Sequence, residues 1–266
     1  MTSSSSKIST AVILAAGMGI RLRDVTGLLP KGLLEIGGKS LISRSLENLK
    51  NEGIDRAVIV TGFQESLYHE NLQQQADIPE LEFVHSRQYE ESGSMHSLFV
   101  AKNYLQEDFL LLESDLLYES RALPSVINFE GPDVVLASCK TGSGDEVYIY
   151  GETCEKQPGY ITSGNILRGK IVAISKKPFP GLSVQGELVG ISKISLKLLN
   201  LMCDYHEAHL EFPCSRHYEE CISDICSKNE IPFLRVGDLV WTEIDDQSHY
   251  DRALKEILPS LIKEQL

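Results

Sequence analysis

The chain has 266 residues, of which 42% are hydrophobic and 24% are charged, a composition typical of a soluble globular protein with one substantial core. Its formal net charge of -13 argues against a surface that binds nucleic acid, and no run of eighteen apolar residues indicates a membrane span. Any phosphate group that the protein binds should therefore meet a local basic cluster or a bridging metal ion.

The first residues, MTSSSSKIST, lack the apolar segment of an export signal. We therefore expect residues 1–8 to form a disordered lead and the protein to be cytoplasmic. The six cysteines form no C-x-x-C pair and have no zinc-ligand spacing, which favours reduced thiols over disulfides. His206 and His209 lie on a polar helix face without a third ligand nearby, so a metal site there is disfavoured.

Four apolar, β-branched runs predict strands that are buried on both faces of a sheet. They cover residues 11–16, 57–62, 109–114 and 133–138. Between the first two runs, Ser40 is a candidate N-cap for a helix with an apolar stripe, and Gly53 is its stop signal. A short strand at 82–86 and a helix at 95–106 separate the second and third runs. This alternation predicts an open α/β sheet.

The second half of the chain predicts antiparallel strands followed by helices. Strands are expected at 147–152, 160–169, 170–177, 186–195, 231–236 and 239–245, with a turn at 168–170 joining the second and third. Helices are expected up to about residue 210, at 217–229 and at the end of the sequence, the last one interrupted near Pro259.

No internal repeat or Pro/Ser-rich linker divides the chain. We predict a single domain over residues 1–266, with a three-layer α/β/α, Rossmann-like core around a mixed, mostly parallel sheet. Residues 140–190 are expected to form a β-rich substrate-binding flank.

The glycine-rich stretch AAGMGIRLR directly follows the first strand, where open α/β sheets bind ligands. Bare glycine backbone approaches phosphate closely, and Arg21 with Lys31 adds positive charge. A dinucleotide fingerprint would need glycine at Leu22, and a P-loop would need glycine at Leu33, so both patterns are excluded. A basic, solvated loop is the alternative interpretation of the glycines and arginines alone.

The whole stretch AVILAAGMGIRLRDVTGLLPKGLLEIGGKSLI resembles the signature of the nucleoside-triphosphate transferases that activate sugar phosphates and small phosphorylated alcohols. That signature reads L-A-A-G-x-G-x-R, then P-K, then a G-K-P-L-like turn. Ile20, Gly32 and the long gap before the lysine depart from it, more against the sugar-activating branch than against the superfamily. The resemblance covers residues 1–60 densely and the rest in islands, and it implies a nucleotide-diphospho-sugar transferase-like fold.

The resemblance also implies roles for residues of the first loop. Arg21 and Lys31 would be catalytic, by holding the pyrophosphate that leaves. Ser94 is a candidate for reading a pyrimidine edge and Gln64 for adding an amide contact, although either could be a helix cap or a loop residue. The nucleotide-binding residues so predicted are Leu14, Ala15, Ala16, Gly17, Met18, Gly19, Gln64, Ser92 and Ser94.

Acidic residues follow or end two predicted strands. Asp115 comes just after the buried run at 109–114, with Glu113 on the same side, while alternation puts Glu243, Asp245 and Trp241 on one face of a late strand. In the family resembled, an acid after a mid-chain strand and another in a W-x-[DE] strand hold Mg²⁺, which implies a magnesium role for Asp115, Glu243 and Asp245. A capping role for Asp115 is the alternative.

The pattern is most similar to the cytidylyltransferases that act on phosphocholine or 2-aminoethylphosphonate. A strand lysine before proline often touches the acceptor phosphate in the family, which favours Lys177, although Lys176 and Lys177 could form an ordinary solvated turn. A quaternary ammonium needs an aromatic cage and a primary ammonium needs carboxylates, of which Glu187 is our preferred candidate. The aromatic candidates for the acceptor are Tyr118, Tyr148, Tyr160 and Trp241.

We therefore predict a CTP-dependent cytidylyltransferase that uses Mg²⁺, transfers CMP to 2-aminoethylphosphonate or, as a close second, phosphocholine, and releases pyrophosphate. Its expected partners are CTP and a small cationic acceptor, without nucleic acid or membrane, and a homodimer is left open. The alternatives are a sugar-1-phosphate nucleotidylyltransferase and a non-catalytic nucleotide-binding regulator of the same fold. The first should carry a G-T-A-like segment near Ser94, and the second usually loses the basic loop or the carboxylates.

Overall fold

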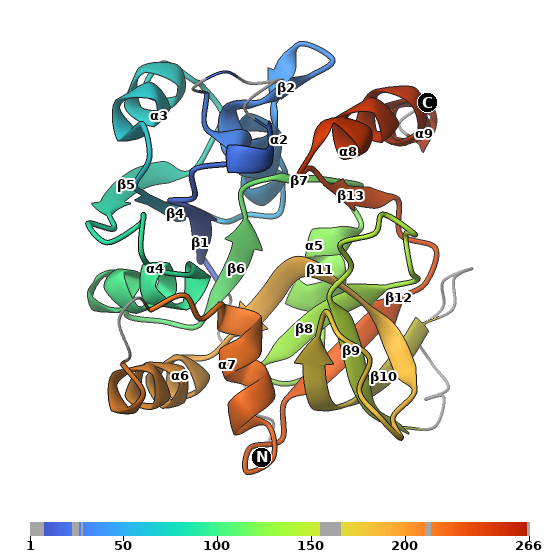
Figure 1. The fold of residues 1–266 in the computed structure, drawn as a ribbon. Helices are drawn as coiled ribbons and strands as arrows, with labels where there is room; N and C mark the ends of the chain where they lie inside the picture. Colours follow the sequence, from blue (N-terminus) through green and yellow to red (C-terminus); the bar gives the residue numbers. More distant parts are fainter. Residues whose placement is uncertain (1–7, 23–26, 28, 155–165, 211–213, 265–266) are drawn as a thin grey trace.

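The computed structural model describes residues 8–22, 27, 29–154, 166–210 and 214–264 (Figure 1). Residues 1–7 of the expected lead and residues 160–165 of an expected strand lie outside this part of the chain. Within it, no helix combines the length and the apolar character that crossing a membrane requires.

Four parallel strands form the N-terminal part of a nine-stranded sheet. They are β1 (Thr10–Ala15), β4 (Arg56–Thr61), β5 (Glu80–His85) and β6 (Phe109–Glu113), in the spatial order β5-β4-β1-β6. The strands expected near these positions are therefore confirmed. All six residues of β1 are buried, as a strand covered on both faces requires.

Helices pack on both faces of these strands and complete three layers (Figure 1). One face carries α2 (Leu41–Asn51), α3 (Glu65–Leu72) and α5 (Ala122–Ile127). The other carries α4 (Ser94–Ala101) with the 3₁₀ turn η3 (Lys102–Tyr104), α6 (Leu196–Ala208) and α7 (Tyr218–Ile225). Alternation along β1 serves both layers, because Ile13 packs into the first and Val12 and Leu14 into the second. Ser40 caps α2 as predicted, its hydroxyl accepting from the Ser43 backbone N–H at 3.3 Å.

Five further strands close on themselves. They are β8 (Val134–Ser138), β9 (Tyr148–Cys154), β10 (Ile166–Ser175), β11 (Val184–Ile194) and β12 (Pro232–Val236). The strands pair around a circuit in the order β11-β8-β12-β10-β9, and β9 pairs again with β11. Of these pairs, only β8 with β12 is parallel, so the whole sheet is mixed and its parallel part lies mainly at the N-terminal strands.

The long strand β11 joins the circuit to the rest of the sheet. Its first residues pair with β9 and its last residues pair antiparallel with β6. The register against β8 shifts between Leu188 and Ser192, and Gly190 between them has a φ of 82°. Glycine adopts this left-handed conformation without a steric penalty, so it allows one strand to bend and serve both parts of the sheet.

The turn predicted at 168–170 is wrong, because these residues lie inside the continuous strand β10. Gly169 pairs with Thr153 on one side and Phe233 on the other. A Cβ atom at Gly169 would lie 2.4 Å from the Glu152 carbonyl oxygen and 2.4 Å from a ring carbon of Phe233. The glycine is thus required by close packing between strands, and not by a turn.

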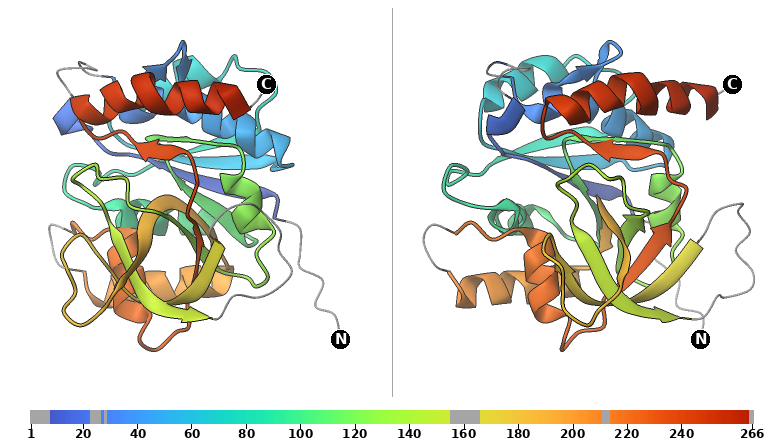
Figure 2. Two further views of the ribbon diagram at one scale, coloured as in Figure 1. Left: turned by 90° about the vertical axis from the view of Figure 1, so that its right-hand side faces the viewer. Right: turned by 45° about the vertical axis from the view of Figure 1, so that its right-hand side comes forward.

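Short elements complete the chain. They are η1 (Ile20–Leu22), η2 (Lys31–Leu33), β2 (Glu35–Ile36), β3 (Lys39–Ser40), β7 (Leu116–Tyr118), β13 (Trp241–Glu243), α8 (Gln247–Arg252), the π-helical turn η4 (Ala253–Ile257) and α9 (Leu258–Glu264). The C-terminal helices pack beside the N-terminal elements at one end of the molecule, with the strand circuit at the other (Figure 2). The π turn ends two residues before Pro259 and confirms the expected interruption of the closing helix.

Candidate active site

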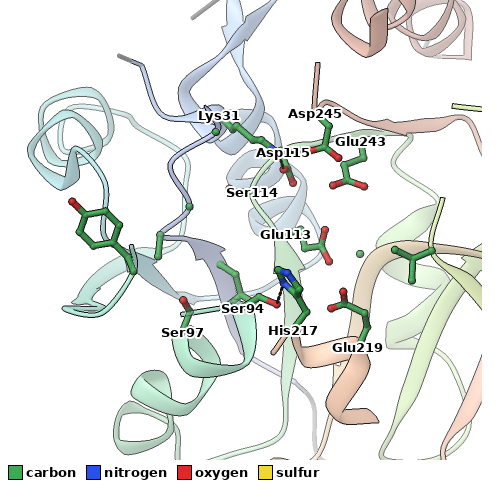
Figure 3. A pocket seen from close by; sticks show the side chains of 18 of the residues that line it. Lys31, Ser94, Ser97, Glu113, Ser114, Asp115, His217, Glu219, Glu243 and Asp245 are labelled. Carbon is green, nitrogen blue, oxygen red and sulfur yellow. Dashed lines mark hydrogen bonds and ion pairs between the residues drawn. The ribbon is translucent and has the colours of Figure 1, made fainter. Parts of the chain in front are cut away.

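A cleft of about 320 Å³ opens beyond the carboxyl ends of β1 and β6, beside the bend in β11. One part of its lining comes from the loop after β1 and from α4 with the residues before it. A second part, here called the flank side, consists of Val147, Lys176, Leu188, Gly190 and Glu219. Figure 3 shows acidic side chains from three different elements turned into the space between these parts.

Three carboxylates, here called the carboxylate cluster, gather at the centre of the cleft. Oxygen atoms of Glu113, Asp115 and Glu243 all lie within 4.8 Å of one another. Glu113 ends β6 and Asp115 follows two residues later, while the antiparallel pairing of β13 with β7 sets Glu243 opposite Leu116. Residues far apart in the sequence therefore meet because of strand pairing.

The cluster concentrates negative charge in a buried place. Burial and the nearby Asp115 carboxylate raise the pKa of Glu113 to about 8. Burial, Asp115 and Glu113 together raise the pKa of Glu243 well above its ordinary value. Carboxylates held this close are stabilised by a cation, and an all-oxygen donor set suits Mg²⁺. The sequence predicts no metal role for Glu113, which joins the cluster because it ends β6 beside Asp115.

Lys31 pairs with two acidic side chains of the site, Asp115 and Asp245. Its ammonium lies 2.9 Å from the Asp115 carboxylate and also pairs with Asp245, whose side chain is only 3% exposed. Burial alone would lower the pKa of Lys31, but the two carboxylates outweigh it and the pKa is raised. Burial would raise the pKa of Asp245, yet Lys31 and other partners hold it well below its usual range.

Asp245 is not one of the three clustered carboxylates but contacts the cluster, because its side chain hydrogen-bonds Glu243 and it shares Lys31 with Asp115. Besides Lys31 it pairs with Arg21, with 3.0 Å between the Arg21 guanidinium and the carboxylate. Asp115 and Glu243 come together as the sequence suggested, and their metal role, with that of Asp245, stays a prediction.

Most of the predicted nucleotide-binding residues line the cleft. Ala15 does not, because alternation turns its side chain into the core on the other face of β1. Met18 and Gln64 do not line it either, and Gln64 instead stands at the N-cap position of α3 with a φ of 53°. The predicted residues that do line it are Leu14, Ala16, Gly17, Gly19, Ser92 and Ser94.

The start of α4 is joined tightly to the residues before α7. The Gly93 backbone N–H donates to the Cys214 carbonyl at 2.8 Å, and a Cβ atom on Gly93 would lie 2.2 Å from the Arg216 carbonyl oxygen. The Ser94 hydroxyl lies 3.2 Å from His217 Nδ1 and accepts from the Tyr218 backbone N–H at 3.1 Å.

This junction brings residues into the cleft that no sequence pattern indicated. His217 and Glu219 both line it, although the helix they begin was expected only as packing (Figure 3). Tyr218 between them is buried in the core and donates its hydroxyl to Glu113 at 2.8 Å. The start of α7 therefore supports the carboxylate cluster as well as lining the cleft.

None of the predicted acceptor-binding residues that the structure describes lines the cleft. Tyr118 and Trp241 are buried in the core. Glu187 is also buried, and its carboxylate accepts from the Thr141 backbone N–H at 2.6 Å and from the Thr141 hydroxyl at 2.9 Å. The Tyr148 ring instead contacts the Lys140 ammonium. Tyr160 lies outside the described residues.

The two adjacent lysines after β10 also differ. Lys176 lines the cleft, whereas Lys177 does not. The Lys177 backbone N–H donates to the Ser175 hydroxyl at 3.0 Å, so the chain turns away from the cleft after Lys176.

The stability of the metal-free protein is expected to fall as the pH rises from about 4.5 to about 8. In this window Glu113 is ionised in the unfolded chain but still protonated in the fold, so the unfolded state binds fewer protons and the free energy of unfolding decreases. Glu113→Gln should reduce this slope, with Glu243 supplying what remains. Urea denaturation in EDTA at a series of pH values measures it, and an unchanged slope in the variant would contradict the assignment.

Residues 10–178 match the family model described as Nucleotidyl transferase. The chain is 29% identical over 154 residues to the UTP--glucose-1-phosphate uridylyltransferase AglF of Haloferax volcanii, an alignment that covers 57% of this chain and 62% of that protein. It is 25% identical over 208 residues to the CTP:phosphoglutamine cytidylyltransferase of Campylobacter jejuni, covering 74% and 77% of the two chains. The chain spans less than two thirds of the length of the first curated relatives that it matches.

The fold agrees with these relationships. The structure of the inositol-1-phosphate CTP transferase from T. maritima superposes with a TM-score of 0.76 at 21% identity, covering 98% of both chains. This similarity confirms the predicted nucleotide-diphospho-sugar transferase-like fold. Since the family model covers well over half of the sequence, the chain belongs to the nucleotidyl transferase family.

Proposed function

We propose that the protein is a cytidylyltransferase that transfers CMP from CTP to a small phosphonate or phosphate acceptor bearing a cationic nitrogen. 2-Aminoethylphosphonate is favoured, with phosphocholine second. In this reaction an acceptor oxygen bonds to the α-phosphorus of CTP, the bond from that phosphorus to the bridging oxygen breaks, and pyrophosphate leaves. The observation that supports it best is the meeting of loop cations and the carboxylate cluster in one cleft.

The residues present fit a magnesium ion. The carboxylate cluster offers only oxygen donors, and its crowding makes a divalent cation favourable. Glu113, Asp115 and Glu243 would hold the ion, with Asp245 as the further predicted ligand. When bound, Mg²⁺ supplies positive charge that neutralises phosphate oxygens.

The chain's own groups can bind the triphosphate. Gly17 and Gly19 line the cleft and present backbone without side chains. Arg21 uses two of its five N–H donors on carboxylates and keeps others for phosphate oxygens. Lys31 remains charged because of its carboxylate partners, so it can offset the charge of the departing pyrophosphate.

The character of the flank side supports a primary ammonium over a quaternary one. Among the described residues it contains no aromatic side chain, whereas a quaternary ammonium needs an aromatic cage. The two tyrosines that line the cleft, Tyr68 and Tyr89, come from α3 and from the segment after β5. The flank side does contain Glu219, and burial raises the pKa of this carboxyl group. The positive charge of an ammonium group beside Glu219 would offset the desolvation of the ionised carboxylate, and its N–H groups could donate hydrogen bonds to the carboxylate oxygens. Lys176 on the same side is a candidate for the acceptor phosphoryl group.

A sugar-1-phosphate nucleotidylyltransferase is the second candidate, because the Haloferax relative is a glucose-1-phosphate uridylyltransferase. A non-catalytic regulator is disfavoured, since the loop cations and the carboxylates are all in place.

Pyrophosphate release should be fastest with CTP and 2-aminoethylphosphonate in a panel of four nucleoside triphosphates against 2-aminoethylphosphonate, phosphocholine and glucose-1-phosphate. Ethylphosphonate, which lacks the ammonium, is the matched acceptor and should lose at least about tenfold in kcat/KM, the scale for an unpaired buried polar group. Glu219→Gln should lower kcat/KM for the amine acceptor and leave ethylphosphonate unaffected. Turnover of glucose-1-phosphate with neither amine accepted would overturn the proposed acceptor.

A further inference from the structure

Asp145 links two cations that line different parts of the cleft. One of its carboxylate oxygens lies 2.6 Å from Arg21 Nη1, and the other lies 2.7 Å from Lys176 Nζ. Arg21 belongs to the loop after β1, Lys176 follows β10, and Asp145 lies in the loop between β8 and β9. A single carboxylate thus connects the N-terminal loop to the end of the strand circuit.

The bridge leaves both cations able to bind a ligand. Arg21 also pairs with Asp245 through Nη2, so two carboxylates fix the plane of its guanidinium group while donors remain for a phosphate. Lys176 uses one of its three donors on Asp145. Asp145 itself does not line the cleft, so it acts on a ligand only through these two side chains.

Folding stability does not account for this arrangement. The Arg21 and Lys176 side chains are 55% and 53% exposed, and ion pairs with such partners contribute little to stability. Asp145 also reduces the electrostatic repulsion between the Arg21 and Lys176 side chains, because its negative charge lies between them. Its pKa is lowered, because hydrogen bonds from Lys176 and Arg21 outweigh the desolvation that would raise it, so it is ionised at neutral pH.

We infer that Asp145 is a positioning residue that couples the binding of the nucleotide to the binding of the phosphorylated acceptor, a role that rests on the proposed function. The Arg21 and Lys176 side chains are about half exposed, so a triphosphate that contacts Arg21 restricts its remaining motion and, through Asp145, that of Lys176 before the acceptor binds. Acceptor binding then loses less conformational entropy, because nucleotide binding has already restricted Lys176. The two ligands therefore bind with positive cooperativity. By reciprocity the acceptor strengthens nucleotide binding by the same factor.

Calorimetry on the full chain tests this role. α,β-Methylene-CTP with Mg²⁺ is titrated into the protein in the absence and presence of saturating 2-aminoethylphosphonate. We expect the acceptor to tighten nucleotide binding by at least about fivefold in the unmodified protein. In Asp145→Ala this ratio should fall to about 1, and in Asp145→Asn, which keeps a hydrogen-bond acceptor, it should be intermediate.

Lys176→Ala should lose the same coupling, and adding Asp145→Ala to it should cause no further loss, because both act through one bridge. Asp251→Ala removes an exposed ion pair with Lys255 away from the cleft and should keep the full ratio. A ratio near 1 in the unmodified protein, a full ratio in Asp145→Ala, or additive losses in the double variant would overturn the inference. If only α,β-methylene-UTP binds, the proposed nucleotide is wrong, and the same comparison made with that analogue still decides the role of Asp145.

Discussion

Asp115→Asn is expected to lower kcat/KM for pyrophosphate release by at least about 100-fold, the scale for losing one fixed electrostatic contact at a reacting phosphate. Asp115 belongs to the carboxylate cluster and accepts from Lys31 at 2.9 Å, so its charge serves both the metal position and the lysine. The asparagine keeps the shape of the side chain but removes the charge that both functions need. Steady-state kinetics over a range of Mg²⁺ concentrations measures the loss.

The same change should leave the fold almost unaltered. Removing the Asp115 charge relieves repulsion that raises the pKa of Glu113 and Glu243, and this offsets the lost ion pair with Lys31, which keeps Asp245. The melting temperature in EDTA is therefore expected to stay within a few degrees of the unmodified protein. Asp55→Asn, which changes a largely exposed partner of Lys50, is the matched control and should retain full activity. A normal rate in Asp115→Asn would remove Asp115 from the active site.

Lys31→Gln should both destabilise the protein and abolish most of its activity. The side chain is 19% exposed and pairs with Asp115 and the buried Asp245, so its loss leaves carboxylates without their main cation. Breaking such a pair is expected to cost about 3 kcal/mol of unfolding free energy. Urea denaturation measures this cost, and Mg²⁺ should restore more stability in the variant than in the unmodified protein, because the ion supplies part of the missing positive charge.

The loss of unfolding free energy in Lys31→Gln should be larger at neutral pH than in acid. Lys31 holds the pKa of Asp245 below the ordinary aspartate value of about 3.9, so the stability from this pair is present above that pH and is lost as the pH falls below it. The difference between the two proteins should therefore shrink in acid. Lys31→Arg keeps the charge and separates the effects, since it should recover stability more than activity. A glutamine variant with unchanged stability at neutral pH would contradict the assigned network.

Local signals in the sequence were sufficient for the elements and for part of the cleft. The apolar runs became β1, β4, β6 and β8, and Ser40 caps α2. The glycine-rich loop lies at the end of β1 and lines the cleft, as its position after a buried strand predicted. Each of these features depends on neighbours within a few residues, and periodicity, capping chemistry and turn preference encode such neighbours directly.

The predicted turn near Gly169 was wrong because local signals are ambiguous there. A glycine between two apolar runs is typical of a hairpin, but the same residue is also needed where strands approach closely. Only the positions of Phe233 and Glu152, which the strand pairing determines, distinguish the two cases.

By itself, the sequence determined most of the strands and helices, the glycine-rich loop at the end of β1 and the family to which the chain belongs. The tertiary structure alone decided that Glu113 joins Asp115 and Glu243, that Asp245 pairs with Lys31, and that α7 brings His217 and Glu219 to the cleft. It also decided that Tyr118, Trp241 and Glu187 are used in packing and internal hydrogen bonds. The physical reason is that these contacts join residues far apart in the sequence, such as Lys31 and Asp245, which are 214 positions apart. Sheet order, strand register and helix docking decide which distant residues meet, and no local pattern in the sequence encodes these three properties.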